Sequence, residues 1–274
     1  MAFGGEDAES YYDEGVTASM RGDIERAIEC FNKTLELDKD FISAYHQLAK
    51  CEMRKGRFEQ AIALLERVIR AKPKQIPPRL DLGHALLQTG RTKEARRIFQ
   101  EVSNVEPANS RALLGLAETA FQEGSWKEAM ELAGQSQAIS GPNFTALYLR
   151  GRAARLAGDL VTAQQCLDDA DNLLGQSIEL TPDQPEGYFL RGEVHFAKEH
   201  YAAALDHFRS SYERASEGRV YTAYGMPFRK LDLLIKQGLC LQRLDRRAQA
   251  REIGELVLEK DPDNKLGKAL KELD

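Results

Sequence analysis

The sequence predicts an all-α solenoid, in which copies of one helix–turn–helix repeat stack along the chain. The first observation is a glycine that returns every 34 residues: Gly22, Gly56, Gly90, Gly124 and Gly158. The second is an alanine with the same interval: Ala27, Ala61, Ala95, Ala129 and Ala163. Chemistry at an active site does not require such a period, whereas the stacking of identical supersecondary elements does.

Each 34-residue repeat contains two segments with helical periodicity. In residues 42–75, apolar side chains recur three and four residues apart on both sides of Gly56, and Pro73 ends the second segment. Glycine suits the turn because it adopts left-handed backbone angles without strain. The predicted repeats span residues 8–41, 42–75, 76–109, 110–143, 144–184, 185–218 and 231–263.

The interval changes twice after the fifth repeat. Pro182 comes seven residues late, which predicts a second helix longer by about two turns in residues 144–184. Residues 219–230 form an aromatic insertion, and we expect a loop or a helix extension that packs locally, with partner binding as the alternative. Residues 264–274 are predicted to form a helix that caps the last repeat. Residues 1–7 are predicted to be disordered.

Composition excludes several classes of function. The chain has 274 residues and a net charge of −5, so it carries no basic surface for nucleic acid or an anionic membrane. It shows no secretory signal and no apolar run of about 18 residues. The four cysteines lack a CxxC spacing and are expected to be buried thiols. We therefore expect a cytoplasmic protein with no direct membrane insertion.

The residues at fixed positions of the repeat resemble those of the tetratricopeptide repeat (TPR) family. Position 8 is small in each copy: Gly15, Ala49, Gly83, Ala117, Gly151, Gly192 and Gly238. Position 20 is always alanine, with Ala204 and Ala250 completing the series. Position 24 is bulky in most copies, as in Phe31, Leu65, Phe99, Leu167 and Phe208. Arg79, Ala133 and Gly254 depart from the family pattern, so packing there is less regular.

The resemblance implies seven repeats in a right-handed superhelix, with the first helix of each repeat lining a concave groove. The implied partner-binding residues are Leu80, His84, Leu87, Leu114, Glu118, Phe121, Tyr148, Arg152, Arg155, Phe189, Glu193 and Phe196. The apolar members predict a strip that a partner covers. The alternative is that the insertions of the later repeats fold back and cover it.

The same positions bear on two more specific kinds of site. The carboxylate clamp by which some family members bind chaperone C-termini is excluded, since Tyr12 and Val16 replace its polar residues in the first repeat. Arg152 and Arg155 suit a ligand carboxylate, although a solvated basic edge explains them as well. His46 and His84, near Asp81, allow a metal site in principle, but groove-lining polar residues are the favoured interpretation.

The predicted function is a protein–protein interaction scaffold or adaptor that binds a partner peptide or helix in its groove. The chain has no GxSxG, HExxH or GxxxxGK[ST] motif, so we expect no catalytic activity, cofactor or metal. One alternative is a self-associating structural solenoid, which makes a homo-oligomer. Another is an RNA-binding helical repeat, which the acidic charge balance disfavours.

Overall fold

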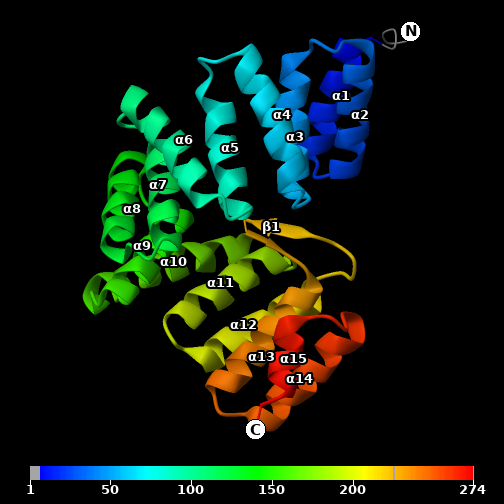
Figure 1. The fold of residues 1–274 in the computed structure, drawn as a ribbon. Coiled ribbons are helices and arrows are strands. Elements are labelled where there is room, and N and C mark those ends of the chain that lie inside the picture. Colours follow the sequence, from blue (N-terminus) through cyan, green and yellow to red (C-terminus); the bar gives the residue numbers. More distant parts are fainter. Residues whose placement is uncertain (1–6, 225, 274) are drawn as a thin grey trace. The chain divides into compact units, whose positions relative to one another are not determined.

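The computed structural model describes residues 7–224 and 226–273, and it is essentially all-α (Figure 1). Its residues form two compact units, which meet in sequence at Gly141 and Pro142. The N-terminal unit contains α1 (Ala8–Met20), α2 (Ile24–Leu37), α3 (Ile42–Arg54), α4 (Phe58–Ala71), α5 (Ile76–Gln88), α6 (Thr92–Val105), α7 (Ser110–Gln122) and α8 (Trp126–Ser140). The predicted disordered segment 1–7 lies outside the described residues except for Asp7, whose carboxylate caps α1.

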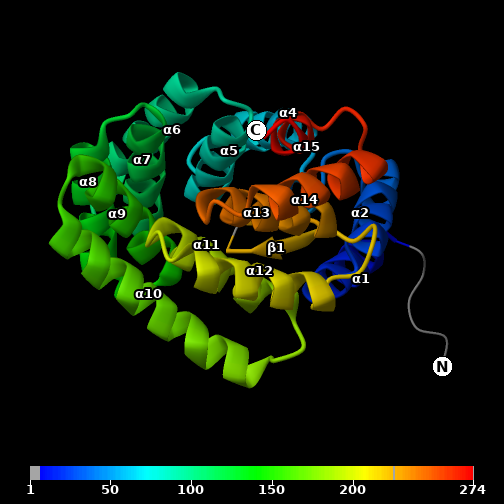
Figure 2. The same ribbon diagram turned by 90° about the horizontal axis from the view of Figure 1, so that it is seen from below.

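The C-terminal unit contains seven helices and one β-hairpin in its described part (Figure 2). Its helices are α9 (Phe144–Ala157), α10 (Leu160–Leu180), α11 (Pro185–Ala197), α12 (Tyr201–Arg214), α13 (Lys230–Arg243), α14 (Arg247–Lys260) and α15 (Lys265–Lys271). Its strands are β1 (Tyr221–Ala223) and β2 (Met226–Phe228). The expected helix–turn–helix fold is confirmed in both units.

Short-range signals determine where the helices begin and end. Asn109 and Asn143 accept hydrogen bonds from the backbone N–H groups of Ala112 and Ala146 at 2.9 and 3.0 Å, so each caps a first helix. Gly56 has a φ of 75°, in the left-handed region where glycine carries no steric penalty. The turn therefore forms without strain between the two helices of a pair.

The two helices of a repeat pack through a small residue at position 8 and a bulky one at position 24. A Cβ atom added to Gly83 would lie 2.5 Å from Cζ of Phe99, and one added to Gly192 would lie 2.6 Å from Cδ1 of Phe208. Both rings are fully buried. The alanines at position 20 are at most 1% exposed, from Ala27 to Ala250. The prediction of small residues where paired helices cross is confirmed.

Gly254 departs from the family pattern for a reason that the structure reveals. A Cβ atom there would lie 2.7 Å from the backbone nitrogen of Lys271 and 2.9 Å from the carbonyl oxygen of Gly267. The backbone of α15 thus occupies the space that a bulky side chain fills in other repeats. The predicted capping helix is confirmed, and Gly254 permits its close approach.

The second helix of the fifth repeat is over-long, as predicted. Helix α10 has 21 residues, against 14 in α2, α4 and α6. Its added turns pack on α11, since a Cβ atom at Gly187 would lie 2.7 Å from Cγ1 of Ile178.

The insertion forms an antiparallel β-hairpin, where a loop or helix extension was expected. Strand β1 pairs with β2 in a register that matches Tyr221 with Phe228 and Ala223 with Met226. Tyr221, Ala223 and Phe228 are at most 4% exposed and belong to the hydrophobic core of the C-terminal unit. The alternation of buried and exposed residues in β1 is the period of a half-buried strand.

A group of histidines lies where α10, α11 and α12 pack together. The rings of His195 and His207 stack with centroids 5.0 Å apart, and Asp171 accepts from Nε of Arg191 at 2.6 Å beside them. Burial, followed by the nearby His195 and Arg191, lowers the pKa of His207 to about 4. Burial also lowers the pKa of His195, against the attraction of Asp171.

No helix within residues 7–224 and 226–273 combines the length and the apolar character needed to cross a membrane.

Two glycine substitutions test the packing of position 8. Gly83→Ala should destabilise the protein by about 1–3 kcal/mol, because its Cβ atom would overlap the buried Phe99 ring. Gly175 lies inside α10, and a Cβ atom added there would meet no neighbouring atom within 4 Å. Gly175→Ala should therefore stabilise the protein by about 0.5–1 kcal/mol through helix propensity alone. Unfolding followed by circular dichroism measures both changes. Equal effects of the two substitutions would show that the ring contact is unimportant.

The partly buried His195 and His207 predict a loss of stability in mild acid. The unfolded chain binds a proton at His207 below its ordinary pKa of 6.5, whereas the folded chain does so only near pH 4. The contribution of His207 to the free energy of unfolding should therefore be complete above pH 6.5 and be lost between pH 6.5 and 4. His207→Gln should have a smaller drop in thermal midpoint from pH 7.5 to pH 5 than the parent protein. The exposed His200→Gln serves as control, and parallel curves for all three proteins would refute the assignment.

Candidate interaction surfaces

In the N-terminal unit, polar side chains link the first helices of successive repeats. Nε2 of His46 on α3 lies 2.8 Å from one oxygen of Asp81 on α5. Arg111 on α7 donates to the other oxygen of Asp81, also at 2.8 Å. Three first helices are thereby joined along one face, which we call the N-terminal inner face.

The charges of this face are matched to one another. Burial alone would raise the pKa of Asp81, but hydrogen bonds from His46 and Arg111 outweigh it and lower that pKa below its usual range. Nδ1 of His84 lies 3.3 Å from an oxygen of Glu118. Each histidine thus faces a carboxylate of the next first helix. Among residues 7–224 and 226–273, no cluster of three or more His, Cys, Asp or Glu side chains is arranged to hold a metal ion.

The predicted apolar residues of this unit divide into two pairs. Leu80 and Leu87 are 2% and 3% exposed and belong to the hydrophobic core, so the expectation that a partner could reach them is wrong. Leu114 and Phe121 are half-buried, and Phe121 packs edge-on against Trp126 with centroids 5.0 Å apart. Leu114 and Phe121 keep apolar surface in reach of a ligand.

In the C-terminal unit the hairpin covers the predicted apolar strip. The ring of Phe228 stacks on Phe189 with centroids 4.1 Å apart, and Tyr224 lies 5.1 Å from Phe144. Figure 2 shows β1 beside α11. Phe189, beneath the hairpin, is 5% exposed, and Tyr148, whose ring stacks on Phe144, is 6% exposed, which corrects their prediction as open groove residues. In this unit an insertion therefore folds back over the predicted groove, as in the alternative to an open apolar strip.

Four other predicted residues of this unit, Arg152, Arg155, Glu193 and Phe196, are partly exposed. The hydroxyl of Tyr148 donates to Glu193 at 3.2 Å, and Nζ of Lys236 on α13 lies 2.6 Å from the other oxygen of Glu193. Burial, with the nearby Glu193 charge, raises the pKa of Tyr148, which stays protonated. Arg155 pairs with Glu199 at 2.6 Å.

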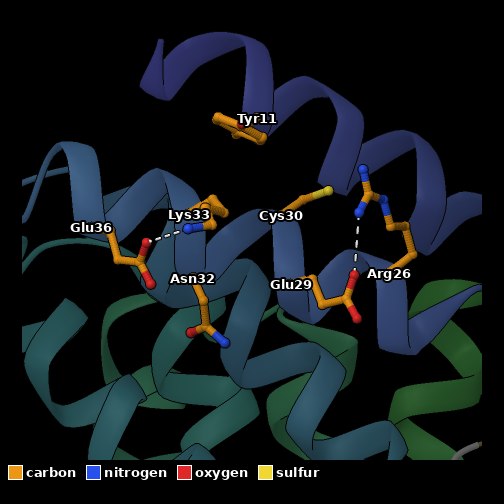
Figure 3. Close-up of a pocket in the computed structure, with 7 residues that line it drawn as sticks. All are labelled: Tyr11, Arg26, Glu29, Cys30, Asn32, Lys33 and Glu36. Atoms are coloured by element: carbon orange, nitrogen blue, oxygen red, sulfur yellow. Dashed lines mark hydrogen bonds and ion pairs between the residues drawn. The ribbon is translucent and has the colours of Figure 1, made fainter. Parts of the chain in front are cut away.

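A depression of about 420 Å³ lies on the first helix pair, between α1 and α2 (Figure 3). Its lining residues are Tyr11, Arg26, Glu29, Cys30, Asn32, Lys33 and Glu36. Arg26 pairs with Glu29 at 3.2 Å and Lys33 with Glu36 at 2.8 Å, as the dashed lines show. These mixed and mutually paired charges favour no particular class of ligand.

Comparison with solved structures supports the fold. A tetratricopeptide repeat protein from Parabacteroides merdae is 13% identical, with a TM-score of 0.61 over 97% of this chain and 98% of that one. MamA (residues 41 to the end) from Desulfovibrio magneticus RS-1 is 18% identical, with a TM-score of 0.54 over 63% of this chain and 97% of that one. The Cut9–Hcn1 hetero-tetramer of APC/C gives 16% identity and a TM-score of 0.60, over 90% of this chain and 45% of that one.

Sequence comparison identifies the family. A protein of Methanocaldococcus jannaschii is 41% identical over 51 residues, which are 19% of this chain and 59% of that protein. One tetratricopeptide repeat model matches residues 18–82, 52–112 and 86–140. Two others match residues 163–219 and 145–169, so the matches together span well over half of the chain. The chain therefore belongs to the tetratricopeptide repeat family.

Proposed function

We propose that this protein is an interaction scaffold, which holds a segment of a partner protein on the N-terminal inner face and catalyses no reaction. The observations that carry the proposal are the row formed by His46, Asp81 and Arg111, and the partly exposed Leu114 and Phe121 on α7. Fixed polar groups next to accessible apolar surface are what a peptide ligand requires.

The hydrogen-bonded row supports binding because it is preorganised. Asp81 is held from two neighbouring helices, and its side chain is only 13% exposed, so the face does not have to rearrange when a partner arrives. A rigid surface loses little conformational entropy on binding. Met20, 84% exposed near the end of α1, adds a flexible apolar side chain to the first helices.

The charge pattern favours protein over nucleic acid as the ligand. Arg111 already pairs with Asp81, and the whole chain carries a net charge of −5. An RNA-binding face needs unmatched cations to neutralise phosphates. A similar fold in the Cut9–Hcn1 hetero-tetramer is consistent with a role in an assembly of protein chains. The four cysteines are buried free thiols, which fits a reducing compartment such as the cytoplasm.

Photo-crosslinking from defined positions tests the proposed face. A benzoylphenylalanine replacing Lys50, an exposed residue of α3 at the position that His84 and Glu118 hold in their repeats, should give discrete partner adducts in extracts of the native host. The same group replacing Arg97, whose side chain is 78% exposed on α6, should give few. Adding Leu114→Ala and Phe121→Ala should reduce the Lys50 adducts at least fivefold while the helical circular dichroism is retained.

Equal labelling from Lys50 and Arg97, or adducts that survive loss of both apolar side chains, would contradict the proposal. Size-exclusion chromatography with light scattering on the unlabelled protein tests the self-association alternative. The scaffold is expected to have the mass of one chain, whereas a self-associating solenoid has the mass of an oligomer.

A further inference from the structure

Three aliphatic side chains are exposed together where α9 ends and α10 begins. Leu156, in the last turn of α9, is 54% exposed, and Leu160 and Val161, the first two residues of α10, are 62% and 80% exposed. Only two residues separate the helices, so the three side chains come from neighbouring helix ends. We name this surface the apolar turn and define it by these three residues. Contiguous exposed apolar surface commonly marks a contact site.

The corresponding turns of the first four repeats are mostly polar or charged. The position of Val161 carries a charge in all four of them: Glu25, Glu59, Lys93 and Lys127. The position of Leu156 is polar or charged in three of them: Arg54, Gln88 and Gln122. The aliphatic residues of the apolar turn are therefore not a requirement of the repeat.

The charged groups beside the apolar turn are matched within the chain. Arg155 pairs with Glu199 at 2.6 Å, and Asp159 accepts a hydrogen bond from the backbone N–H of Thr162 at the start of α10. A ligand that depends on unmatched cations, such as nucleic acid or an anionic membrane, is not favoured by these residues. An apolar ligand is favoured, because it gains from covering aliphatic surface.

The pair of Arg155 and Glu199 also places the turn of the sixth repeat beside the apolar turn. Glu199 lies between α11 and α12, and α12 begins at Tyr201, which is partly exposed and packs edge-on against Phe196 at 5.3 Å. Packed helices lie about 8–10 Å apart, and side chains seven residues apart on an α-helix are about 10 Å apart. One face of a two-turn helix can therefore contact both turns.

The backbone of the apolar turn favours a helical ligand over an extended one. The turn consists of two helix ends, in which the N–H groups of Gly158 and Asp159 already donate to the carbonyls of Arg155 and Ala154, at 3.1 and 2.9 Å. An extended segment would leave its own N–H and C=O groups unpaired against aliphatic side chains, which is costly. A helix satisfies those groups internally.

We infer that the apolar turn, together with Tyr201, binds a short amphipathic helix of a partner protein, whose aliphatic side chains lie on Leu160 and Val161. Such a helix presents apolar residues on one face at intervals of three, four and seven residues. A second copy of this chain fits less well, because a stable interface covers about 800 Å² on each partner, far more than three aliphatic side chains expose. This site lies in the C-terminal unit and does not depend on the proposed function.

Titration with a designed peptide, followed by methyl NMR of the full chain, tests the inference. The probe is an 18-residue helical peptide of zero net charge with leucines on one face, and its counterpart has the same composition in an order that spreads the leucines around the helix. The amphipathic peptide should shift the methyl signals of Leu156, Leu160 and Val161, and should bind at least tenfold more tightly than its counterpart. The signals of Leu180, 84% exposed at the other end of α10, should not move.

Two sets of substitutions locate the site. Val161→Glu introduces the residue that the first two repeats carry at this position, so the thermal midpoint should be retained. Combined with Leu160→Gln, it should weaken peptide binding at least tenfold. Leu180→Gln is the matched control, because it removes a comparably exposed leucine from the same helix, and it should change the affinity less than twofold. If the double variant fails to fold, Val161→Glu alone decides.

Absence of saturable binding, equal weakening by Leu180→Gln, or equal affinity for the scrambled peptide would overturn the site. A dimer that Val161→Glu dissociates in light scattering would overturn it in favour of a second copy. Binding to uncharged phosphatidylcholine vesicles that Val161→Glu abolishes would overturn it in favour of lipid. None of these substitutions lies on the N-terminal inner face, so failure here leaves the crosslinks from Lys50 unchanged.

Discussion

The packing of a bulky side chain against a glycine or alanine of the paired helix is the constraint on which the rest of this structure depends. The Phe99 ring on α6 is the clearest case, since it fills the space beside Gly83 on α5 and also that beside Gly115 on α7. One ring thus sets the spacing of two first helices. That spacing brings Asp81 and Arg111 within hydrogen-bonding distance, and so creates the polar row of the N-terminal inner face.

Much of this architecture follows from sequence because the packing constraint is periodic. A glycine such as Gly83 or an alanine such as Ala95 recurs wherever two helices cross, so a fixed interval reveals each crossing. The seven-residue delay of Pro182 likewise revealed two added turns in α10, because an insertion of that length keeps the same helix face inward. The capping helix could be predicted since its apolar face follows the last repeat.

The candidate sites were less predictable from sequence. A residue's position in the repeat indicates on which side of its helix it lies, but it does not show whether another segment of the chain covers it. Leu80 and Phe189 hold repeat positions that the family pattern assigns to the groove, yet both are buried, one in the core of its own unit and one beneath the hairpin. The alternation of side chains around Tyr221 and Ala223 was the available signal for the hairpin. Three-residue strands are too short for that signal to stand out against the helical periodicity around them.

The two units therefore use the same repeat in different ways. In the N-terminal unit the first helices present matched charges beside Leu114 and Phe121, which suits a preorganised docking face. In the C-terminal unit the chain supplies its own occupant for half of that face, and Phe228 turns what would be a groove into core. Fold alone does not distinguish the two units, whereas the burial of their first-helix side chains does.

A double-mutant cycle on Gly83 and Phe99 tests the central packing claim most directly. Phe99→Leu, Gly83→Ala and the combined variant are unfolded in urea alongside the parent protein. If the ring and the glycine fill one space, the smaller leucine accommodates the new methyl group, and the double variant is more stable than the sum of the single losses by about 1 kcal/mol. Strictly additive losses would contradict the account, since they would mean that the two residues do not share that space.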